Sequence, residues 1–219
     1  MRIDNLLHFL YICIYNRSIA FVECKLEGCL IMIIRLTVLI LLALQWLYWF
    51  IKSKEAEKKK PKTQFTSFKI IIEKFFGIVG NTVVTFQLIG MKIYPFSSNT
   101  LIHYFGFFLV LVGITLAITA RKQLDSNWTH AYDYQIKREH TLVTDGIYQY
   151  IRHPIYSGII FTSLGVQLIV QSYLFFFALL ALPWCYYWGK REEKILSTHF
   201  GMEYKNYMKK TKMFIPYIF

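Results

Sequence analysis

Residues 146–158, GIYQYIRHPIYSG, stand directly before an apolar run that reaches residue 170. The stretch combines an arginine, a histidine, three tyrosines and a proline at the point where the long apolar segment begins. Cationic groups are costly at a membrane boundary unless they hold a partner or a polar ligand. We therefore expect this stretch to be the entrance to a membrane-spanning helix and part of a ligand site.

The composition of the 219-residue chain is that of a membrane protein, with 55% hydrophobic and 18% aromatic residues. Only 17% of the residues are charged, against about 25% in soluble domains. A net charge of +12 would indicate nucleic acid in a soluble protein, but here the basic residues lie between apolar runs. We predict an all-α, polytopic integral membrane protein that contacts membrane lipids and binds no nucleic acid.

Five segments are candidate transmembrane helices, judged by apolar stretches of about 20 residues. They divide the chain into an N-terminal extension (1–31), a region with three spans (32–120) and a C-terminal region with two spans (121–219). Only Gln171 and Ser172 separate the last two spans, so these are predicted to form a helical hairpin. The five spans are Met32–Ile51, Phe75–Tyr94, Leu101–Ala120, Ile155–Val170 and Tyr173–Trp188.

The distribution of lysine and arginine predicts the orientation. The segments 52–74, 121–153 and 189–219 carry eight, five and seven of these residues, which is 20 of the 25 in the chain. Five spans place all three segments on one side, and basic loops favour the cytoplasm. We therefore expect the C-terminus and a cap formed by these segments to lie in the cytoplasm.

The sequence Arg152–His153–Pro154 predicts the start of a helix. Proline fixes its own φ and disfavours the helical region for the residue before it, so His153 should lie just outside the helix. Cationic side chains beside free N–H groups at a helix N-terminus form an anion site, and Tyr156 shares a face with His153. The alternative is that Arg152 and His153 only reach toward lipid headgroups.

Two carboxylates, Glu192 and Glu193, follow the last predicted span beside Lys190 and Arg191. They either pair with these neighbours, where exposed pairs contribute only about 0–1 kcal/mol, or they bind a cationic ligand.

The remaining features are structural. The four cysteines form no C-x-x-C pair and have no histidine at zinc spacing, so we predict neither a metal site nor a disulfide framework. A helix break is expected at Phe200–Gly201, and the tail Ile215–Pro216–Tyr217 is expected to pack back onto the cap.

Together these motifs resemble the isoprenylcysteine carboxyl methyltransferase family, integral membrane enzymes that use S-adenosylmethionine. The resemblance covers the C-terminal half of the chain. It implies methyl transfer to a lipid-like acceptor, foremost the carboxylate of a C-terminal isoprenylcysteine on a prenylated substrate. The positions that it assigns to cofactor binding are His140, Leu142, Val143, Tyr148, His153, Pro154, Tyr156, Glu192 and Glu193.

The residues expected to serve the reaction itself are Arg152, His153 and Arg191. Eukaryotic members of the family carry an arginine one turn before the carboxylate that matches Glu192, where it meets the substrate. Trp188 occupies that position here, so Arg191 or Lys190 would replace that arginine.

Three alternatives use the same residues differently. A phospholipid amine as methyl acceptor would require a proton acceptor, for which His153 or Glu193 are candidates. Membrane sterol-type reductases that use NADPH share an R-H-x-x-Y pattern but differ at the positions of Ile155 and Ser157. A non-catalytic scaffold or transporter would concentrate polar residues within the spans rather than at their cytoplasmic ends.

Overall fold

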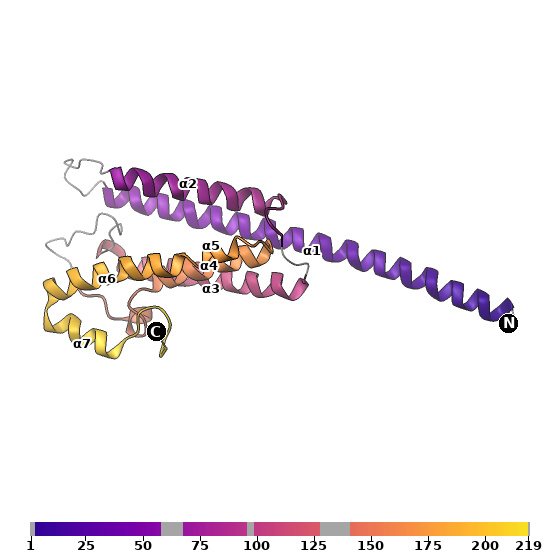
Figure 1. Ribbon diagram of the computed structural model, residues 1–219. Helices are drawn as coiled ribbons and strands as arrows, with labels where there is room; N and C mark the ends of the chain where they lie inside the picture. Colours follow the sequence, from indigo (N-terminus) through magenta and orange to yellow (C-terminus); the bar gives the residue numbers. More distant parts are fainter. Residues whose placement is uncertain (1–2, 58–67, 96–98, 128–140, 219) are drawn as a thin grey trace.

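The computed structural model describes residues 3–57, 68–95, 99–127 and 141–218 (Figure 1). These residues form helices and no strand, and two isolated β-bridges pair Pro95 with Ser172 and Ile151 with Lys212. The predicted all-α class is therefore confirmed for this part of the chain. The elements are α1 (Ile3–Glu57), α2 (Phe68–Leu88), α3 (Thr100–Leu124), η1 (Asp125–Asn127), η3 (Gly146–Gln149), α4 (Pro154–Ile169), α5 (Phe175–Ala178), α6 (Ala181–Phe200) and α7 (Met202–Lys210).

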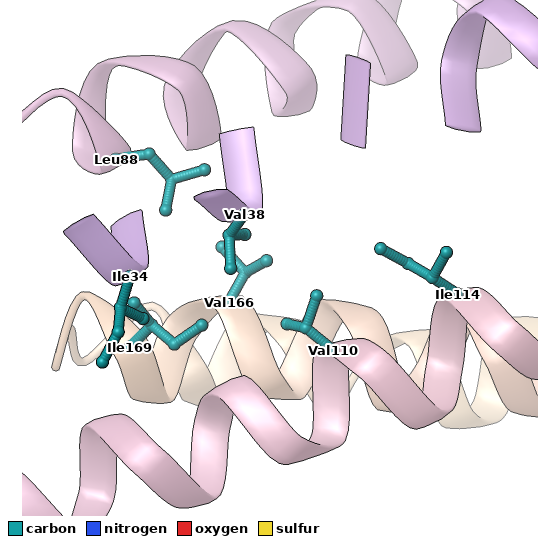
Figure 2. Close-up of a cluster of buried hydrophobic side chains, with 7 residues drawn as sticks. All are labelled: Ile34, Val38, Leu88, Val110, Ile114, Val166 and Ile169. Atoms are coloured by element: carbon teal, nitrogen blue, oxygen red, sulfur yellow. The ribbon is translucent and has the colours of Figure 1, made fainter. Parts of the chain in front are cut away.

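The helices form two groups. Helices α1 and α2 lie side by side, and α3, α4 and α6 form a second group next to them (Figure 1). An apolar core joins the groups, because side chains from α1 and α2 pack against side chains from α3 and α4. Figure 2 shows its seven buried members, Ile34, Val38, Leu88, Val110, Ile114, Val166 and Ile169.

Glycines allow α3 and α4 to pack backbone against backbone. A Cβ atom on Gly106 of α3 would lie 2.6 Å from the carbonyl oxygen of Gly165 on α4. Seven residues further along α3, the carbonyl oxygen of Gly113 would lie 2.6 Å from a Cβ atom on Gly158 of α4. Small residues at such spacings are the usual means of close helix contact in membranes. The neighbour that approaches Gly158 is therefore helix α3.

Two of the predicted spans are confirmed as helices long and apolar enough to cross a membrane. The predicted span Met32–Ile51 lies within the apolar part of α1, Leu26–Glu55. The predicted span Leu101–Ala120 lies within α3. Apolar side chains such as Leu101 and Phe108 of α3 are exposed, as expected of a surface that lipid covers. Helix α4 agrees with the predicted fourth span but is shorter than a full crossing. The total of five spans stays a prediction.

The second predicted span differs in its ends. Helix α2 starts at Phe68 and stops at Leu88, because the chain turns at Gly90, which has φ +115°. Gln87, which interrupts the apolar pattern, is buried and exchanges hydrogen bonds of 3.1 and 3.4 Å with Gln167 of α4. This pair satisfies two amide groups that would otherwise be unpaired in an apolar environment.

The predicted hairpin is present, but its second arm differs from the prediction. The chain reverses after α4 at Gln171 (φ +50°), and the segment expected as one span divides into α5 and α6. Helix α6 then continues to Phe200 and ends at Gly201 (φ +56°), which confirms the predicted break. The carboxylates expected after the span therefore lie inside a helix, and the antiparallel return brings them back to the start of α4.

Helix α1 begins long before the predicted first span. It runs from Ile3 to Glu57 with no interruption at residue 31. The boundary that we placed before Met32 is therefore not marked by the end of a helix, and the interpretation of residues 1–31 as a dispensable extension stays a prediction.

We predict that Gly113→Ala destabilises the protein by about 1–3 kcal/mol, the usual cost of overpacking. Its Cβ would clash with the Thr162 hydroxyl and lie 2.7 Å from the Gly158 carbonyl oxygen. The control is Gly80→Ala on α2, where nothing lies within 4 Å of the added Cβ. Thermal unfolding in detergent measures both variants, and equal unfolding temperatures would show that the glycine contact contributes nothing.

Candidate active site

The site begins at the N-terminus of α4. Pro154 is the first helical residue, and His153 precedes it with φ −125° and ψ 59°, outside the helical region as predicted. The His153 carbonyl accepts hydrogen bonds from the backbone N–H and the hydroxyl of Ser157, at 3.1 and 3.2 Å. The imidazole is thereby fixed at the end of the helix, with only 6% of the residue exposed.

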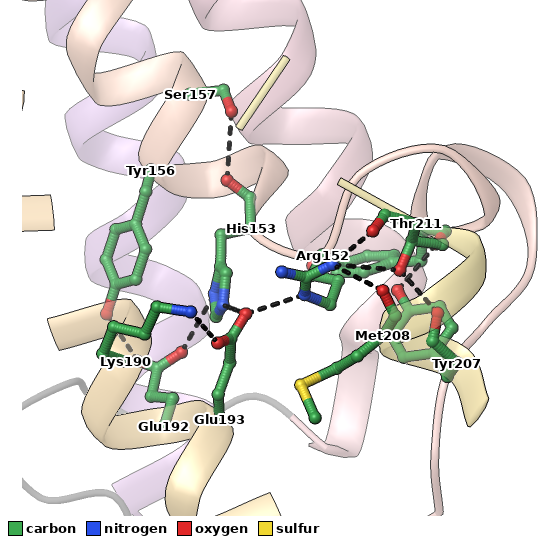
Figure 3. Close-up of polar contacts among 11 residues, drawn as sticks. Arg152, His153, Tyr156, Ser157, Lys190, Glu192, Glu193, Tyr207, Met208 and Thr211 are labelled. Atoms are coloured by element: carbon green, nitrogen blue, oxygen red, sulfur yellow. Dashed lines mark hydrogen bonds and ion pairs between the residues drawn. The ribbon is translucent and has the colours of Figure 1, made fainter. Parts of the chain in front are cut away.

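Helix α6 places two carboxylates against this imidazole (Figure 3). His153 Nδ1 lies 3.5 Å from Glu192 Oε2, and His153 Nε2 lies 3.5 Å from Glu193 Oε1. The Tyr156 hydroxyl donates a 2.5 Å hydrogen bond to Glu192 Oε1, and its ring stacks on His153 with centroids 5.6 Å apart. His153 and Tyr156 therefore lie on the same face of α4, as predicted. Glu192 of α6 contacts both side chains.

The Arg152 side chain is 9% exposed and makes hydrogen bonds through two of its nitrogens. Its Nε donates a 2.7 Å hydrogen bond to Glu193 Oε1, and both side chains are less than 10% exposed. One terminal nitrogen donates to the backbone carbonyls of Met208 and Thr211. Lys190, which is about half exposed, binds the other oxygen of Glu193 at 2.8 Å. Glu193 is thus held by cations on both sides, and Arg152 positions a carboxylate and the backbone that follows α7.

The opposite charges of this cluster shift the pKa values of His153 and Glu193 toward their charged forms. Burial lowers the pKa of His153, but the facing carboxylates Glu192 and Glu193 outweigh it, so that pKa lies above its usual 6.5. Burial raises the pKa of Glu193, but its bonds with His153, Lys190 and Arg152 lower it to about 2. The stabilisation from His153 is present below pH 6.5 and disappears as pH rises through its raised pKa. That from Glu193 is present above pH 4.5 and disappears as pH falls toward 2.

The C-terminal segment Thr211–Phe214, here called the latch, forms part of the site although no sequence motif indicated it. Arg152 N–H donates to the Lys212 carbonyl at 2.8 Å, and His153 N–H donates to the Met213 carbonyl at 3.1 Å. The Ser157 hydroxyl also donates to the Phe214 carbonyl at 2.6 Å. The available signal was the pair Met213–Phe214, apolar residues after the basic end of α7, and both are buried.

Other predicted site residues lie outside this cluster. Tyr148 is buried, with its hydroxyl directed to the Ala120 carbonyl at 3.4 Å and its own carbonyl bound by the Tyr207 hydroxyl at 2.6 Å. These two hydrogen bonds join η3 to α3 and α7. Leu142 and Val143 are half-buried in the segment that leads to η3. His140 lies outside the described residues.

Arg191 and Trp188 occupy different environments. Trp188 is 2% exposed and packs with Tyr156 and Met213 in an apolar cluster. Arg191 is exposed, with its guanidinium 5.0 Å from the centre of the Trp188 ring. Because Lys190 is bound to Glu193, Arg191 is the better placed of the two cations proposed to replace the missing arginine.

The sequence around this cluster is similar to that of known methyltransferases. Residues 101–203, from α3 to the start of α7, match the family model of phospholipid methyltransferases. The chain is 29% identical to protein-S-isoprenylcysteine O-methyltransferase B of Arabidopsis thaliana, over 59% of this chain and 64% of that protein. It is 32% identical to the protein-S-isoprenylcysteine O-methyltransferase of Xenopus laevis, over 59% of this chain and 46% of that protein. This chain resembles the isoprenylcysteine carboxyl methyltransferases.

The fold agrees with this resemblance. The solved structure of a eukaryotic intramembrane Ras methyltransferase, an isoprenylcysteine carboxyl methyltransferase, aligns with a TM-score of 0.57 and 23% identity. The alignment covers 81% of this chain and 64% of that one. Together with the apolar helices, the shared fold identifies a helical membrane protein. This chain spans about half to two thirds of the Xenopus and Arabidopsis methyltransferases.

We predict that Arg152→Gln lowers the free energy of unfolding by about 3–5 kcal/mol at neutral pH, because it removes one of the cationic partners of a buried carboxylate. The loss should shrink as pH falls below 4.5, where Glu193 of the variant takes up a proton. Unfolding in detergent from pH 7 to pH 4 measures this dependence, and Lys194→Gln, an exposed change on α6, is the control. A loss independent of pH would mean that Arg152 acts only through its bonds to the latch.

Proposed function

We propose that this protein is a membrane methyltransferase that transfers a methyl group from S-adenosylmethionine to the carboxylate of an isoprenylcysteine. The observation that carries this proposal is the buried cluster of His153, Glu192 and Glu193 where α4 meets α6. The cluster lies within the region that matches methyltransferases. Its combination of a partly open carboxylate, an imidazole and an aromatic ring fits a cationic cofactor.

Several groups in and beside the cluster are candidates for direct contact with the cofactor. His153 Nε2 is buried, and its contact among the described residues is the 3.5 Å ion pair with Glu193 Oε1, which is too long and poorly aligned for a standard hydrogen bond. The Glu192 side chain is 15% exposed, against 6% for Glu193, so Glu192 is the carboxylate that can still accept from an ammonium group. The face of the Tyr156 ring favours a nearby positive sulfur. The half-buried Leu142 and Val143 are the candidates for apolar contact with the adenine.

The proposed chemistry requires no proton transfer. S-adenosylmethionine supplies a methyl group on a positively charged sulfur, and a carboxylate oxygen of the acceptor bonds to this methyl carbon as the carbon–sulfur bond breaks. The carboxylate is already ionised at neutral pH. The protein therefore acts by holding the reactants in line and excluding water, which agrees with a site that has binding groups but no nucleophile paired with a base.

Arg191 is the proposed partner of the acceptor carboxylate. It lies on the same helix as Glu192, one residue earlier, and its guanidinium is exposed. Arginine binds carboxylates through two parallel hydrogen bonds, which also orients the reacting oxygen. We propose that this end of the bundle faces the cytoplasm, which the distribution of basic segments favours. The cofactor would then enter from the cytoplasm and the lipid-like acceptor from the membrane.

A phospholipid amine is the second candidate acceptor, because the matched family model is that of phospholipid methyltransferases. An amine must lose a proton before or during methylation. The two facing carboxylates raise the pKa of His153 and so favour its protonated form, which cannot accept a further proton. Glu193, with a pKa of about 2, is no better. The electrostatics thus favour an acceptor that needs no base.

We predict that His153→Ala and Glu192→Ala each weaken S-adenosylmethionine binding by roughly 10- to 150-fold, the equivalent of about 1.5–3 kcal/mol for a hydrogen bond to a charged group. Tyr156→Phe should weaken binding less than Tyr156→Ala, because the ring remains while the bond that orients Glu192 is lost. Calorimetry on the detergent-purified protein measures all four affinities.

The matched controls are His199→Ala and Glu203→Ala, which change the same residue types at exposed positions on α6 and α7. Both should bind like the unchanged protein. If the folded His153 and Glu192 variants also bind normally, the cofactor site is elsewhere and the proposed function loses its basis. Binding of NADPH in place of S-adenosylmethionine would instead indicate a reductase.

We predict that Arg191→Gln raises the KM for S-farnesylcysteine roughly two- to fivefold, as for an exposed ion pair, while cofactor affinity stays unchanged. Transfer of a labelled methyl group to S-farnesylcysteine and, separately, to phosphatidylethanolamine measures acceptor use. The control is Lys194→Gln, which removes a neighbouring exposed charge on the same helix. Methylation of only the amine would refute the carboxylate acceptor but leave methyl transfer in place.

A further inference from the structure

The last residues of the chain form an exposed apolar tail. After the latch, Ile215, Tyr217 and Ile218 are 38%, 83% and 75% exposed. The sequence had suggested that this segment packs back onto the cap, and the structure shows instead that burial ends at Phe214, which is 4% exposed. Large side chains at such exposure on a protein surface usually mark a contact with a partner or a lipid.

The tail lies at the end of the bundle that carries the active site. Figure 1 shows the C-terminus beside α7, and the latch connects the tail to the start of α4. The Tyr217 ring meets the Tyr150 ring edge-on at 6.5 Å, and Tyr150 is itself 47% exposed. Exposed tyrosines gather at membrane–water interfaces, where the ring sits among headgroups and the hydroxyl reaches water.

Basic residues accompany the apolar ones. Helix α7 buries Tyr204 and Tyr207 and turns its other side to solvent. The exposed residues on and just after this helix include four lysines and, within the described chain there, one acid, Glu203. A surface of this composition attracts anionic headgroups. The lysines are Lys205, Lys209, Lys210 and Lys212.

We propose that the tail Ile215–Ile218 and these four lysines form a lipid-binding surface for the adjoining leaflet. The apolar side chains enter the interface between headgroups and acyl chains, and the lysines bind anionic headgroups. A protein partner fits less well, because a stable interface buries about 800 Å² on each side, more than a four-residue tail presents. Neither the resemblance to methyltransferases nor the proposed reaction assigns this role to these residues.

The placement couples lipid contact to the active site. The tail follows directly on the latch, whose backbone accepts hydrogen bonds from the N–H groups of Arg152 and His153. Anchoring the tail in the leaflet holds the latch against α4 and so maintains the position of the imidazole. The surface is independent of methyl transfer itself, so a test of lipid contact does not depend on the proposed function.

The test measures the depth of a nitroxide attached at Ile218→Cys in the full chain. Cys13, Cys24 and Cys29 are replaced by serine, and the buried Cys185 is retained. The labelled protein is reconstituted in phosphatidylcholine vesicles with and without phosphatidylglycerol, and collisions with oxygen and with a water-soluble nickel complex are compared. The reference positions are Phe108→Cys on the apolar surface of α3 and Thr198→Cys on the exposed side of α6.

We expect the label at position 218 to collide with oxygen more than the label at 198, and with nickel less, when phosphatidylglycerol is present. Lys209→Gln and Lys210→Gln should each shift the balance between inserted and free tail by about fivefold toward the free state. Nickel access equal to that at position 198 would overturn the proposal, as would insertion that ignores both phosphatidylglycerol and the lysines. Protection from both reagents would also overturn it and indicate a protein partner.

Discussion

Direct backbone contact between α3 and α4 is the constraint on which the rest of the structure depends. Helices cannot approach this closely if either carries a Cβ at the contact, and glycines on both partners remove it at Gly106, Gly113, Gly158 and Gly165. In a lipid environment the hydrophobic effect does not drive helices together, so close packing of backbones supplies the attraction. Because two contacts seven residues apart fix the register, the N-terminus of α4 has one position relative to α3, and His153 is placed with it.

The hairpin converts this register into an active site. Helix α6 returns antiparallel to α4 and continues beyond the apolar region, so Glu192 and Glu193 stand opposite His153. Buried charges of this kind are weak contributors to net stability, since desolvation offsets most of their attraction. Their effect is geometric: each carboxylate is held from two directions, and only one of them, Glu192, keeps exposure for a ligand. Arg152 binds both Glu193 and the backbone of the latch, and so holds the two together.

The latch gives the C-terminus a role that its sequence does not indicate. Its backbone carbonyls accept from Arg152, His153 and Ser157, and backbone acceptors leave no signature in residue type. The same chain then carries exposed apolar and basic residues outward at the end of the bundle. The latch thus contacts His153, and the tail that follows it directly in the chain forms the proposed lipid-binding surface. The active site and that surface are therefore only a few residues apart in sequence.

The sequence by itself determined the helical class, the apolar spans in α1 and α3, the start of α4 at Pro154 and the break at Gly201. Each follows from local rules, namely apolar length, the fixed φ of proline and the positive φ open to glycine. It also identified His153, Tyr156, Glu192 and Glu193 as one group through resemblance. Only the tertiary structure decided that α6 continues past the apolar region, that Arg152 faces the latch and that Tyr148 lies against Ala120. These outcomes depend on which surfaces meet across long separations in the chain, and no local pattern encodes that choice.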